Sequence, residues 1–368
     1  MSCFIIAEAG VNHNGSLQTA FELVDCATEC GADAIKFQTF KASRLVATNT
    51  AMASYQEQNL GQSGSQLDML RSLELSMDDF LKIQQHCQKR KIYFMTTAFD
   101  TESLHQVVKY FPLPYIKISS GDLVDAPLLL AAASHQLPIL LSCGMADIPE
   151  IETALSVLAY GFTKTPDTPP SLAAFRTSWQ NPAGRKMVSS LVTLLQCTTS
   201  YPAPFSDINL RAMKTLEQTF NVQTGFSDHT QGIEASITAC ALGAKVIEKH
   251  ITLSKDMQGP DHIASTEPDE FKKMIRSIRN VEAALGVSNK QISSSEKNNR
   301  LPARKSLRAI THIKKGQIIT EEDIQIIRPG NGNTPFAYWD IIGTPASQSY
   351  PPDTPLNEPI PALPTNAS

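Results

Sequence analysis

Short apolar segments alternate with helical patterns along the first 250 residues, and this alternation restricts the fold more than any other feature. Eight such segments, rich in β-branched residues, occupy residues 3–10, 33–38, 92–97, 115–120, 138–143, 192–197, 222–227 and 245–250. Between them, stretches such as Leu17–Cys30 and Met77–Arg90 carry apolar residues every three or four positions, the period of an amphipathic helix. Alternating strands and helices indicate a parallel sheet covered by helices.

Eight strand–helix units within about 250 residues match the size of a (β/α)₈ barrel, the TIM barrel. We therefore predict an α/β fold with a TIM barrel over residues 1–285, and we keep an open, doubly wound sheet as the alternative. The first apolar segment is not followed by a GxGxxG sequence. A dinucleotide-binding fold, which has its phosphate-binding turn at that point, is therefore disfavoured.

The pattern changes beyond the predicted barrel. Residues 286–303 are rich in Ser and Asn and poorly periodic, which is typical of a linker. Short β-like runs return over residues 304–350, where Thr320 is placed to cap a following turn. We expect a small β-rich domain there, which packs against the barrel or a partner subunit because so short a unit buries little apolar surface. Residues 351–368 are rich in proline, and we expect an extended tail with a disordered end.

Composition excludes several classes of protein. The 368 residues carry 32 Lys and Arg against 36 Asp and Glu, a net charge of −4, whereas a protein that coats nucleic acid needs a basic surface. No apolar run approaches the ~18 residues that span a bilayer, and the N-terminus lacks the basic region of a signal peptide. We therefore expect neither nucleic acid nor membrane as a partner. The seven cysteines are scattered, which indicates reduced thiols in a cytoplasmic protein.

Polar side chains recur at the ends of the predicted strands. In a TIM barrel the interior is filled by branched apolar side chains, and the chemistry takes place at the carboxyl ends of the strands. The polar residues at those ends are Glu8, Lys36, Gln38, Asp100, Lys117, Ser119, Ser120, Ser142, Thr198, Thr199, Tyr201, Ser227, Asp228, His229, Glu248, Lys249 and His250. We therefore expect the functional site at this end of the barrel.

Two lysines, Lys36 and Lys117, lie within apolar strand segments. A buried lysine is costly unless an anion pairs with it. Because several serines lie at the same rim, a phosphate or carboxylate ligand is the interpretation that we favour. The alternative is that the lysines form internal salt bridges with Glu8 and Glu248.

Two histidines, His229 and His250, end neighbouring strand segments, so their imidazoles can converge. Neutral imidazole suits a divalent metal, and two histidines with water and substrate oxygens leave an open, catalytic coordination sphere. Glu8, Glu248 and Asp261 are available as further ligands or as acceptors that orient the rings. We favour the metal over the alternative, in which each histidine ends a strand and bonds to a backbone carbonyl.

Two cysteines, Cys143 and Cys197, also end strand segments close to the predicted site. Neither has a histidine partner in a recognisable sequence motif. We therefore expect both thiols to pack rather than to act as nucleophiles.

An ordered set of motifs runs through both predicted domains. In the barrel the motifs are IAEAGVNHNG (6–15), GADAIKFQTFKA (31–42), YIKISSGD (115–122), LLSCGMADIPEIE (140–152), CTTSYPAPFSDINLRAM (197–213), GFSDHTQG (225–232), ALGAKVIEKHITL (241–253) and GPDHIAS (259–265). In the second domain they are ARKS (303–306) and IRPGNG (327–332). The set resembles the sialic acid synthase family, and its last two members resemble the antifreeze-like SAF domain of that family. The resemblance covers roughly residues 3–350.

The resemblance implies an activity. Synthases of this family condense phosphoenolpyruvate with an N-acetylated mannosamine-type sugar, and they release phosphate and a nine-carbon 2-keto sugar acid. They use a divalent metal, Mn²⁺ or Mg²⁺, and work as domain-swapped homodimers. We expect N-acetylneuraminate synthesis from N-acetylmannosamine by C–O cleavage. The alternatives are legionaminic or pseudaminic acid synthesis from a diacetamido-trideoxy hexose and, in a different class, a sugar- or phosphate-binding barrel without catalysis.

The resemblance also implies roles for single residues. Those implied to bind phosphoenolpyruvate are Lys36, Lys117, Ser120, Ser142 and Ser227. Those implied to bind the sugar are Gln38, Thr199, Tyr201, Asp261 and Arg328, the last by reaching into the partner's site. His229 and His250 correspond to the metal ligands, and Glu8 to an acid near the reacting aldehyde. Together with Lys117, these three are the expected catalytic residues.

Three positions depart from residues that are usual in the family: Cys143 stands for Thr, Gln196 for His, and Thr199 for the Asn of some members. None of the three changes removes a charged catalytic group. We therefore expect an active enzyme.

Overall fold

The computed structural model describes the chain except for residues 1, 53–56, 58–63, 164–167 and 361–368. The described residues form two compact units, one within Met1–Gly286 and one within Val287–Ser368.

Eight parallel strands of the first unit close into a barrel in chain order, because β8 pairs with β1. The strands are β1 (Phe4–Gly10), β2 (Ala34–Thr39), β3 (Tyr93–Ala98), β4 (Ile116–Ile118), β5 (Ile139–Ser142), β6 (Val192–Cys197), β7 (Gln223–Asp228) and β8 (Val246–His250). Each strand overlaps a segment that the sequence predicts. The TIM barrel is therefore confirmed, and the open sheet is not formed.

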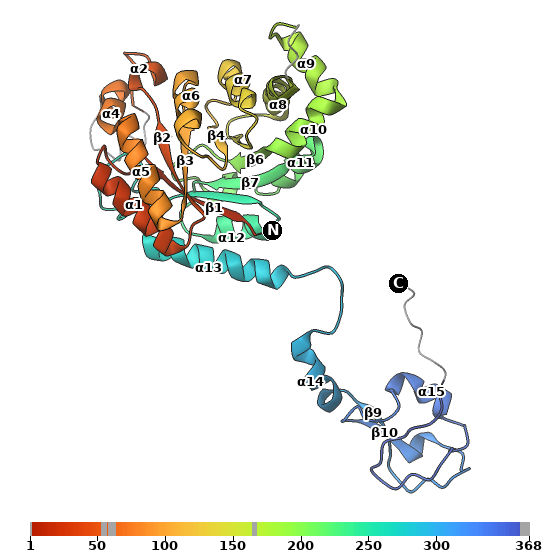
Figure 1. Ribbon diagram of the computed structural model, residues 1–368. Helices are drawn as coiled ribbons and strands as arrows, with labels where there is room; N and C mark the ends of the chain where they lie inside the picture. The colour runs from red at the N-terminus through yellow and green to blue at the C-terminus, as the bar shows by residue number, and fades with distance from the viewer. Residues whose placement is uncertain (1, 53–56, 58–63, 164–167, 361–368) are drawn as a thin grey trace. The chain divides into compact units, whose positions relative to one another are not determined.

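Helices cover the outside of the barrel (Figure 1). Those between or after the strands are α1 (Leu17–Cys30), α2 (Ala42–Leu45), α4 (Gln66–Leu73), α5 (Met77–Arg90), α6 (Thr101–Tyr110), α7 (Ala126–Ser134), α8 (Ile148–Thr163), α9 (Leu172–Gln180), α10 (Pro182–Leu191), the 3₁₀ turn η1 (Phe205–Asp207), α11 (Ala212–Phe220), α12 (Glu234–Ala241) and α13 (Pro268–Leu285). Helices α1 and α5 have the predicted bounds. Ser76 begins α5 by accepting a hydrogen bond from Asp79 N, which satisfies a backbone donor at the start of the helix.

An apolar layer fills the interior of the barrel. It consists of the buried residues Ile6, Ala34, Met95, Leu140, Leu195 and Val246. Because side chains alternate between the two faces of a strand, the residue two positions further along faces the interior again. Two positions beyond this layer stand Glu8, Lys36, Thr97, Ser142, Cys197 and Glu248. The strand period therefore places a mostly polar layer above the apolar one, at the carboxyl ends of the strands.

The next residues along β7 and β8, Asp228 and Lys249, pair with each other. Asp228 and Lys249 form a buried ion pair in which Nζ lies 2.9 Å from Oδ2. The same Oδ2 accepts a hydrogen bond of 2.6 Å from Ser236 Oγ on α12, and Lys249 Nζ donates to Thr230 O at 2.8 Å. The pair thus ties two strands to the helix that connects them.

Two further expectations concern the whole chain. No helix in the described ranges has the length and apolar character that crossing a membrane requires. The seven cysteines are free thiols, and all but Cys26 are buried. Buried thiols behave as small apolar side chains, but the packing role that we predicted for Cys143 and Cys197 stays a prediction, because Cys197 Sγ lies 3.6 Å from His229 Nδ1.

The second unit contains an antiparallel pair of strands, β9 (Ser306–Ala309) and β10 (Ile324–Ile327), as expected of a small β-rich domain. Its other elements are α14 (Ser294–Ala303), the 3₁₀ turns η2 (Glu321–Asp323) and η3 (Pro335–Ala337), and α15 (Tyr338–Ile341). Thr320 stands at the N-cap of η2 as predicted, and its N–H and Oγ1 both donate to Asp323 Oδ2. Helix α14 lies within the stretch that we expected to be a linker.

Part of the proline-rich tail belongs to the core of the second unit. The buried apolar residues of this core are Leu307, Ala309, Ile313, Ile319, Ile324, Ala337, Ile341, Ala346, Tyr350 and Leu356. Leu356 N donates to Leu307 O at 2.9 Å, which fixes the tail beside β9. The stretch for which we expected disorder, residues 361–368, lies outside the described residues.

Replacing the buried carboxylate should destabilise the barrel. We expect Asp228→Asn to lower the free energy of unfolding by about 3–5 kcal/mol, because Lys249 keeps its buried charge without an anionic partner. Urea unfolding followed by circular dichroism measures this loss. The control is Glu217→Gln, which breaks an exposed pair with Lys214 and should cost less than about 1 kcal/mol. Equal losses in the two variants would contradict this role of the buried pair.

Candidate active site

One cavity of about 720 Å³ opens at the carboxyl ends of the strands. Its lining includes every predicted site residue except Arg328: Glu8, Lys36, Gln38, Lys117, Ser120, Ser142, Thr199, Tyr201, Ser227, His229, His250 and Asp261. The barrel thus brings these residues together from segments that are far apart in the chain. Arg328 lies in the second unit, directly after β10, where it is exposed.

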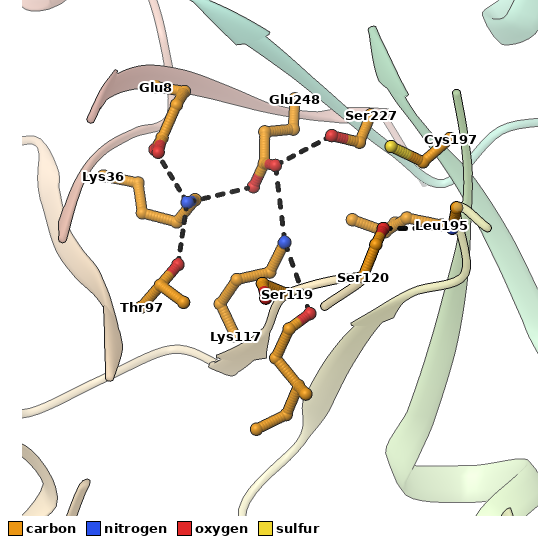
Figure 2. Close-up of polar contacts among 12 residues, drawn as sticks. Glu8, Lys36, Thr97, Lys117, Ser119, Ser120, Leu195, Cys197, Ser227 and Glu248 are labelled. Carbon is orange, nitrogen blue, oxygen red and sulfur yellow. Dashed lines mark hydrogen bonds and ion pairs between the residues drawn. The ribbon is translucent and has the colours of Figure 1, made fainter. Parts of the chain in front are cut away.

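Lys36 is the centre of a buried ion-pair network (Figure 2). Its Nζ lies 2.7 Å from Glu8 Oε2 and 3.6 Å from Glu248 Oε2. The same Nζ donates a hydrogen bond of 2.9 Å to Thr97 Oγ1. Only 2% of the residue is exposed, and these oxygens offset the cost of removing its charge from water.

Glu248 connects this network to the second lysine (Figure 2). Its Oε1 lies 3.5 Å from Lys117 Nζ and accepts a hydrogen bond of 2.9 Å from Ser227 Oγ. Both lysines therefore form the internal salt bridges that we kept as the alternative interpretation. Both of these contacts of Lys117 are long, however. Its Nζ lies 3.5 Å from Glu248 Oε1 and 3.4 Å from Ile118 O. An ammonium group has three donors, so these weak contacts leave capacity for an anion.

The serine hydroxyls differ in their partners. Ser142 Oγ is buried and has no hydrogen-bond partner in the part of the chain that the structure describes. Ser120 Oγ accepts a hydrogen bond of 3.0 Å from Gly144 N, and Ser227 is bound to Glu248. Leaving a buried hydroxyl unpaired costs free energy. Ser142 is therefore a donor that a ligand in this cavity can satisfy.

The two buried glutamates have opposite pKa shifts. Burial raises the pKa of Glu8 to about 7, although Lys36 opposes this effect. Burial acts on Glu248 in the same direction, but Lys117 and Lys36 outweigh it and lower its pKa to about 2. Glu248 stays ionised because it faces two lysines, whereas Glu8 can exchange a proton near neutral pH.

The two histidines lie side by side at the ends of β7 and β8. The centroids of the His229 and His250 rings are 5.6 Å apart, and the Tyr201 ring lies 4.2 Å and 5.9 Å from them. His229 Nδ1 is 2.7 Å from Thr198 O, which favours a proton on Nδ1 and a lone pair on Nε2. Burial lowers the pKa of His250 well below its ordinary value, so this ring is neutral. For His229, burial also acts to lower the pKa, but Cys197 and the Thr198 carbonyl raise it.

These histidines fit the donor set of an open metal site. A neutral imidazole with a free lone pair is the form that binds a divalent ion. Within the described ranges, no group of three or more His, Cys, Asp and Glu side chains is arranged to hold a metal. An ion held by His229 and His250 would therefore need water and substrate oxygens as its remaining ligands.

Sequence reasoning missed several residues of the cavity. Thr97 binds Lys36, and the period of β3 could have indicated it, because Thr97 follows the interior residue Met95 by two positions. Cys197 was expected close to the site, but its contact with His229, in which Sγ lies 3.6 Å from Nδ1, joins two segments far apart in the chain and no local motif reveals it. The apolar lining residues Val11, Met69, Leu70, Leu73 and Phe99 also lacked a signal, since three of them belong to a helix outside the strand pattern.

Comparisons with known proteins relate the whole chain to one family. The NeuB family model matches residues 23–290, and the SAF domain model matches residues 304–359. The N,N′-diacetyllegionaminic acid synthases of Campylobacter jejuni and Legionella pneumophila are 42% and 40% identical to this chain. These alignments cover 96% and 97% of this chain, and 98% and 94% of the relatives.

A solved structure supports the same relationship. The N-acetylneuraminic acid (sialic acid) synthetase of Leptospira borgpetersenii, in complex with citrate, is 32% identical, with a TM-score of 0.65. The match covers 81% of this chain and 90% of that one. Since the family model covers most of the chain, and relatives above 30% identity span nearly all of it, this protein belongs to the NeuB family and carries a C-terminal SAF domain.

Proposed function

We propose that this protein synthesises N,N′-diacetyllegionaminic acid by condensing phosphoenolpyruvate with a diacetamido-trideoxy hexose, with release of phosphate. The observation that carries the proposal is that one cavity gathers two buried lysines, two buried carboxylates and two histidines. The raised pKa of Glu8, about 7, favours catalysis over binding alone, because perturbed buried acids cluster at catalytic sites.

The proposal revises the acceptor that we expected from the sequence motifs. The motifs favoured N-acetylneuraminate synthesis and kept legionaminic or pseudaminic acid as alternatives. The relatives at 42% and 40% identity are both N,N′-diacetyllegionaminic acid synthases, whereas the N-acetylneuraminic acid synthetase structure is 32% identical. Groups that hold phosphoenolpyruvate do not separate these activities, because the acceptor sugars differ at their distal positions. Identity along the whole chain therefore favours the diacetamido sugar.

Phosphoenolpyruvate brings a phosphate and a carboxylate, and the cavity offers cations and hydroxyls to both. Lys36 and Lys117 supply positive charge, while Ser120, Ser142 and Ser227 supply hydroxyls. The long contacts of Lys117 and the unpartnered Ser142 Oγ support an anion at this point. Hydrogen bonds between an ammonium group and a phosphate are charge-assisted and stronger than neutral ones.

The condensation needs a proton at the aldehyde oxygen of the sugar while C3 of phosphoenolpyruvate attacks the aldehyde carbon. Glu8 suits this role, because an acid with a pKa of about 7 holds and releases a proton at neutral pH. Water then adds to the cationic C2, and the tetrahedral intermediate breaks its C–O bond to release phosphate. Lys36 and Lys117 accelerate this step to the extent that they bind the departing phosphate more tightly as its charge develops.

His229 and His250 would hold the divalent metal, Mn²⁺ or Mg²⁺, that the resemblance implies. When bound, the ion supplies Lewis-acid polarisation of a carbonyl oxygen. Thr198 O orients the His229 ring, and the Tyr201 ring packs against both imidazoles. These contacts hold the two rings in place before substrate arrives.

The proposal includes a domain-swapped homodimer in the cytoplasm. The resemblance implies an arginine at the N-acyl group of the sugar, and the described lining of the cavity contains no arginine. Arg328 is exposed in the second unit, and we assign this contact to it across the subunit boundary. The free, mostly buried cysteines support a reducing compartment.

Acceptor preference tests the proposed activity. With Mn²⁺ and phosphoenolpyruvate, we expect kcat/KM to be about tenfold or more higher for the diacetamido-trideoxy hexose than for N-acetylmannosamine, because a site built for one acceptor leaves groups unpaired with the other. Phosphate release and the mass of the product measure this. A preference for N-acetylmannosamine would overturn the acceptor, and turnover of neither sugar would overturn the enzyme.

Metal removal tests the two histidines. We expect chelation to abolish turnover and added Mn²⁺ to restore it, and we expect His250→Ala to lower kcat at least about 100-fold because the ion loses a ligand. Titration calorimetry with Mn²⁺ should show no binding to this variant. His312→Ala, which changes an exposed histidine of the second unit, is the control and should bind Mn²⁺ like the wild type. Full Mn²⁺ binding by His250→Ala would contradict the ligand assignment.

Arg328 tests the partner contact. We expect Arg328→Ala to raise the KM of the sugar about tenfold, since a hydrogen bond to a charged group contributes about 1.5–3 kcal/mol, while the KM of phosphoenolpyruvate stays unchanged. Lys314→Ala removes another exposed cation of the same unit and should change neither constant. An unchanged sugar KM in Arg328→Ala would show that this contact is wrong.

A further inference from the structure

We infer that one face of α4 is the wall that selects a deoxy, acetamido-bearing acceptor, with Met69 and Leu73 in contact with its alkyl groups. This inference rests on the proposed function. It assigns the choice of acceptor sugar to α4, because the groups that hold phosphoenolpyruvate do not distinguish between the acceptors. It concerns the distal end of the sugar, where the diacetamido-trideoxy hexose has a methyl group in place of the terminal hydroxymethyl of N-acetylmannosamine.

The lining of the cavity is largely divided by chemistry, with Lys36 of β2 and Met145 after β5 as exceptions. The groups that suit phosphoenolpyruvate come largely from the β4, β5 and β7 side, where Lys117, Ser142 and Ser227 stand. The apolar lining residues Val11, Met69, Leu70, Leu73 and Phe99 come from the segments that follow β1, β2 and β3. This uneven distribution favours an orientation with the anion beside Lys117 and the alkyl end of the sugar beside α4.

The α4 face is built by helical spacing. Gln66, Met69, Leu70 and Leu73 all line the cavity, at positions i, i+3, i+4 and i+7, which lie on one side of a helix. Met69 is half-buried, so its side chain is accessible from the cavity. A thioether side chain is flexible and fills irregular apolar contacts, which suits it to a methyl or acetyl group.

Contacts on three sides fix α4 over the mouth of the barrel. Leu70 and Leu73 are buried in a cluster with Val11. Glu74, directly after the helix, accepts a hydrogen bond of 2.7 Å from Ala42 N. The backbone approach at Gly15 is close, because a Cβ there would lie 2.6 Å from Ser72 O. A wall held in this way is preorganised, and it does not need binding energy to form.

A second cavity of about 580 Å³ adjoins the first at this wall. Both are lined by Met69, Leu73 and Pro260. The additional acetamido group of a diacetamido sugar makes the acceptor longer and bulkier than N-acetylmannosamine. The adjoining space offers room for that group beyond Met69, with polar residues such as Asn14 and Ser65 around it.

The wall discriminates through desolvation. The methyl end of the deoxy sugar buries apolar surface against Met69 and Leu73, and removing apolar surface from water is favourable. The terminal hydroxyl of N-acetylmannosamine would lose water at the same place without gaining a partner from these side chains. One such group in an apolar pocket changes kcat/KM by about 10–200-fold.

A polar side chain of the same size tests the wall. We expect Met69→Gln to lower kcat/KM for the diacetamido-trideoxy hexose about tenfold, to change that for N-acetylmannosamine less than about twofold, and to leave the KM of phosphoenolpyruvate unchanged. Met69→Leu should retain the wild-type preference. Met145→Gln is the matched control, because Met145 lines the same cavity after β5 and should leave the acceptor ratio unchanged. Phosphate release with each sugar gives the ratio, and thermal unfolding verifies that each variant is folded.

The outcomes separate this inference from the function on which it rests. A fall of the ratio in Met69→Gln alone supports the wall. A wild type that prefers the diacetamido sugar, with the same ratio in Met69→Gln, would overturn the wall and leave the proposed function standing. A wild type that prefers N-acetylmannosamine, or that turns over neither sugar, would overturn both.

Discussion

The pairing of buried charges at the mouth of the barrel is the constraint on which the site depends. Lys36 is shared between Glu8 and Glu248, and Glu248 is shared between Lys36 and Lys117. Because these four side chains are almost completely buried, each charge fixes the position of the next. The unequal sharing also moves the pKa values of the two carboxylates apart. Glu248 faces two cations and stays ionised, whereas the pKa of Glu8 lies near neutrality. One network thus provides both a fixed charge and an exchangeable proton.

The order of strands around the barrel arranges the chemistry of the cavity. Strands β4, β5 and β7 contribute Lys117, Ser142 and Ser227, strands β8 and β1 contribute His250 and Glu8, and the segments after β1 to β3 contribute the apolar wall. The lysine with the hydroxyl groups, the histidine with Glu8, and the apolar residues therefore occupy successive sectors around one closed sheet. The buried pair of Asp228 and Lys249 has a different task, since it binds β7 and β8 to α12.

Much of the fold followed from periodicity. The eight strands and the bounds of α1 and α5 were predictable because apolar spacing differs between strands and helices. The polar cavity was predictable for a related reason, since β-strand side chains alternate and Ile6 is followed by Glu8 on the same face. The period could also have indicated Thr97. It could not have indicated Met69 and Leu73, because α4 lies in an extended connection between β2 and β3 whose position depends on packing with Val11 and on the close approach to Gly15.

The sequence by itself determined the barrel, the small β-rich domain, the family, and the residue types at the strand ends, because these depend on local period and on motifs within short stretches. Only the tertiary structure decided that Lys36 binds both glutamates, that Cys197 lies beside His229, and which buried acid can exchange a proton. These properties depend on distances between segments up to about 240 residues apart in the chain, such as Glu8 and Glu248, and on how completely the closed barrel removes water from them. No local pattern carries that information, because pairing and burial exist only once the strands have closed.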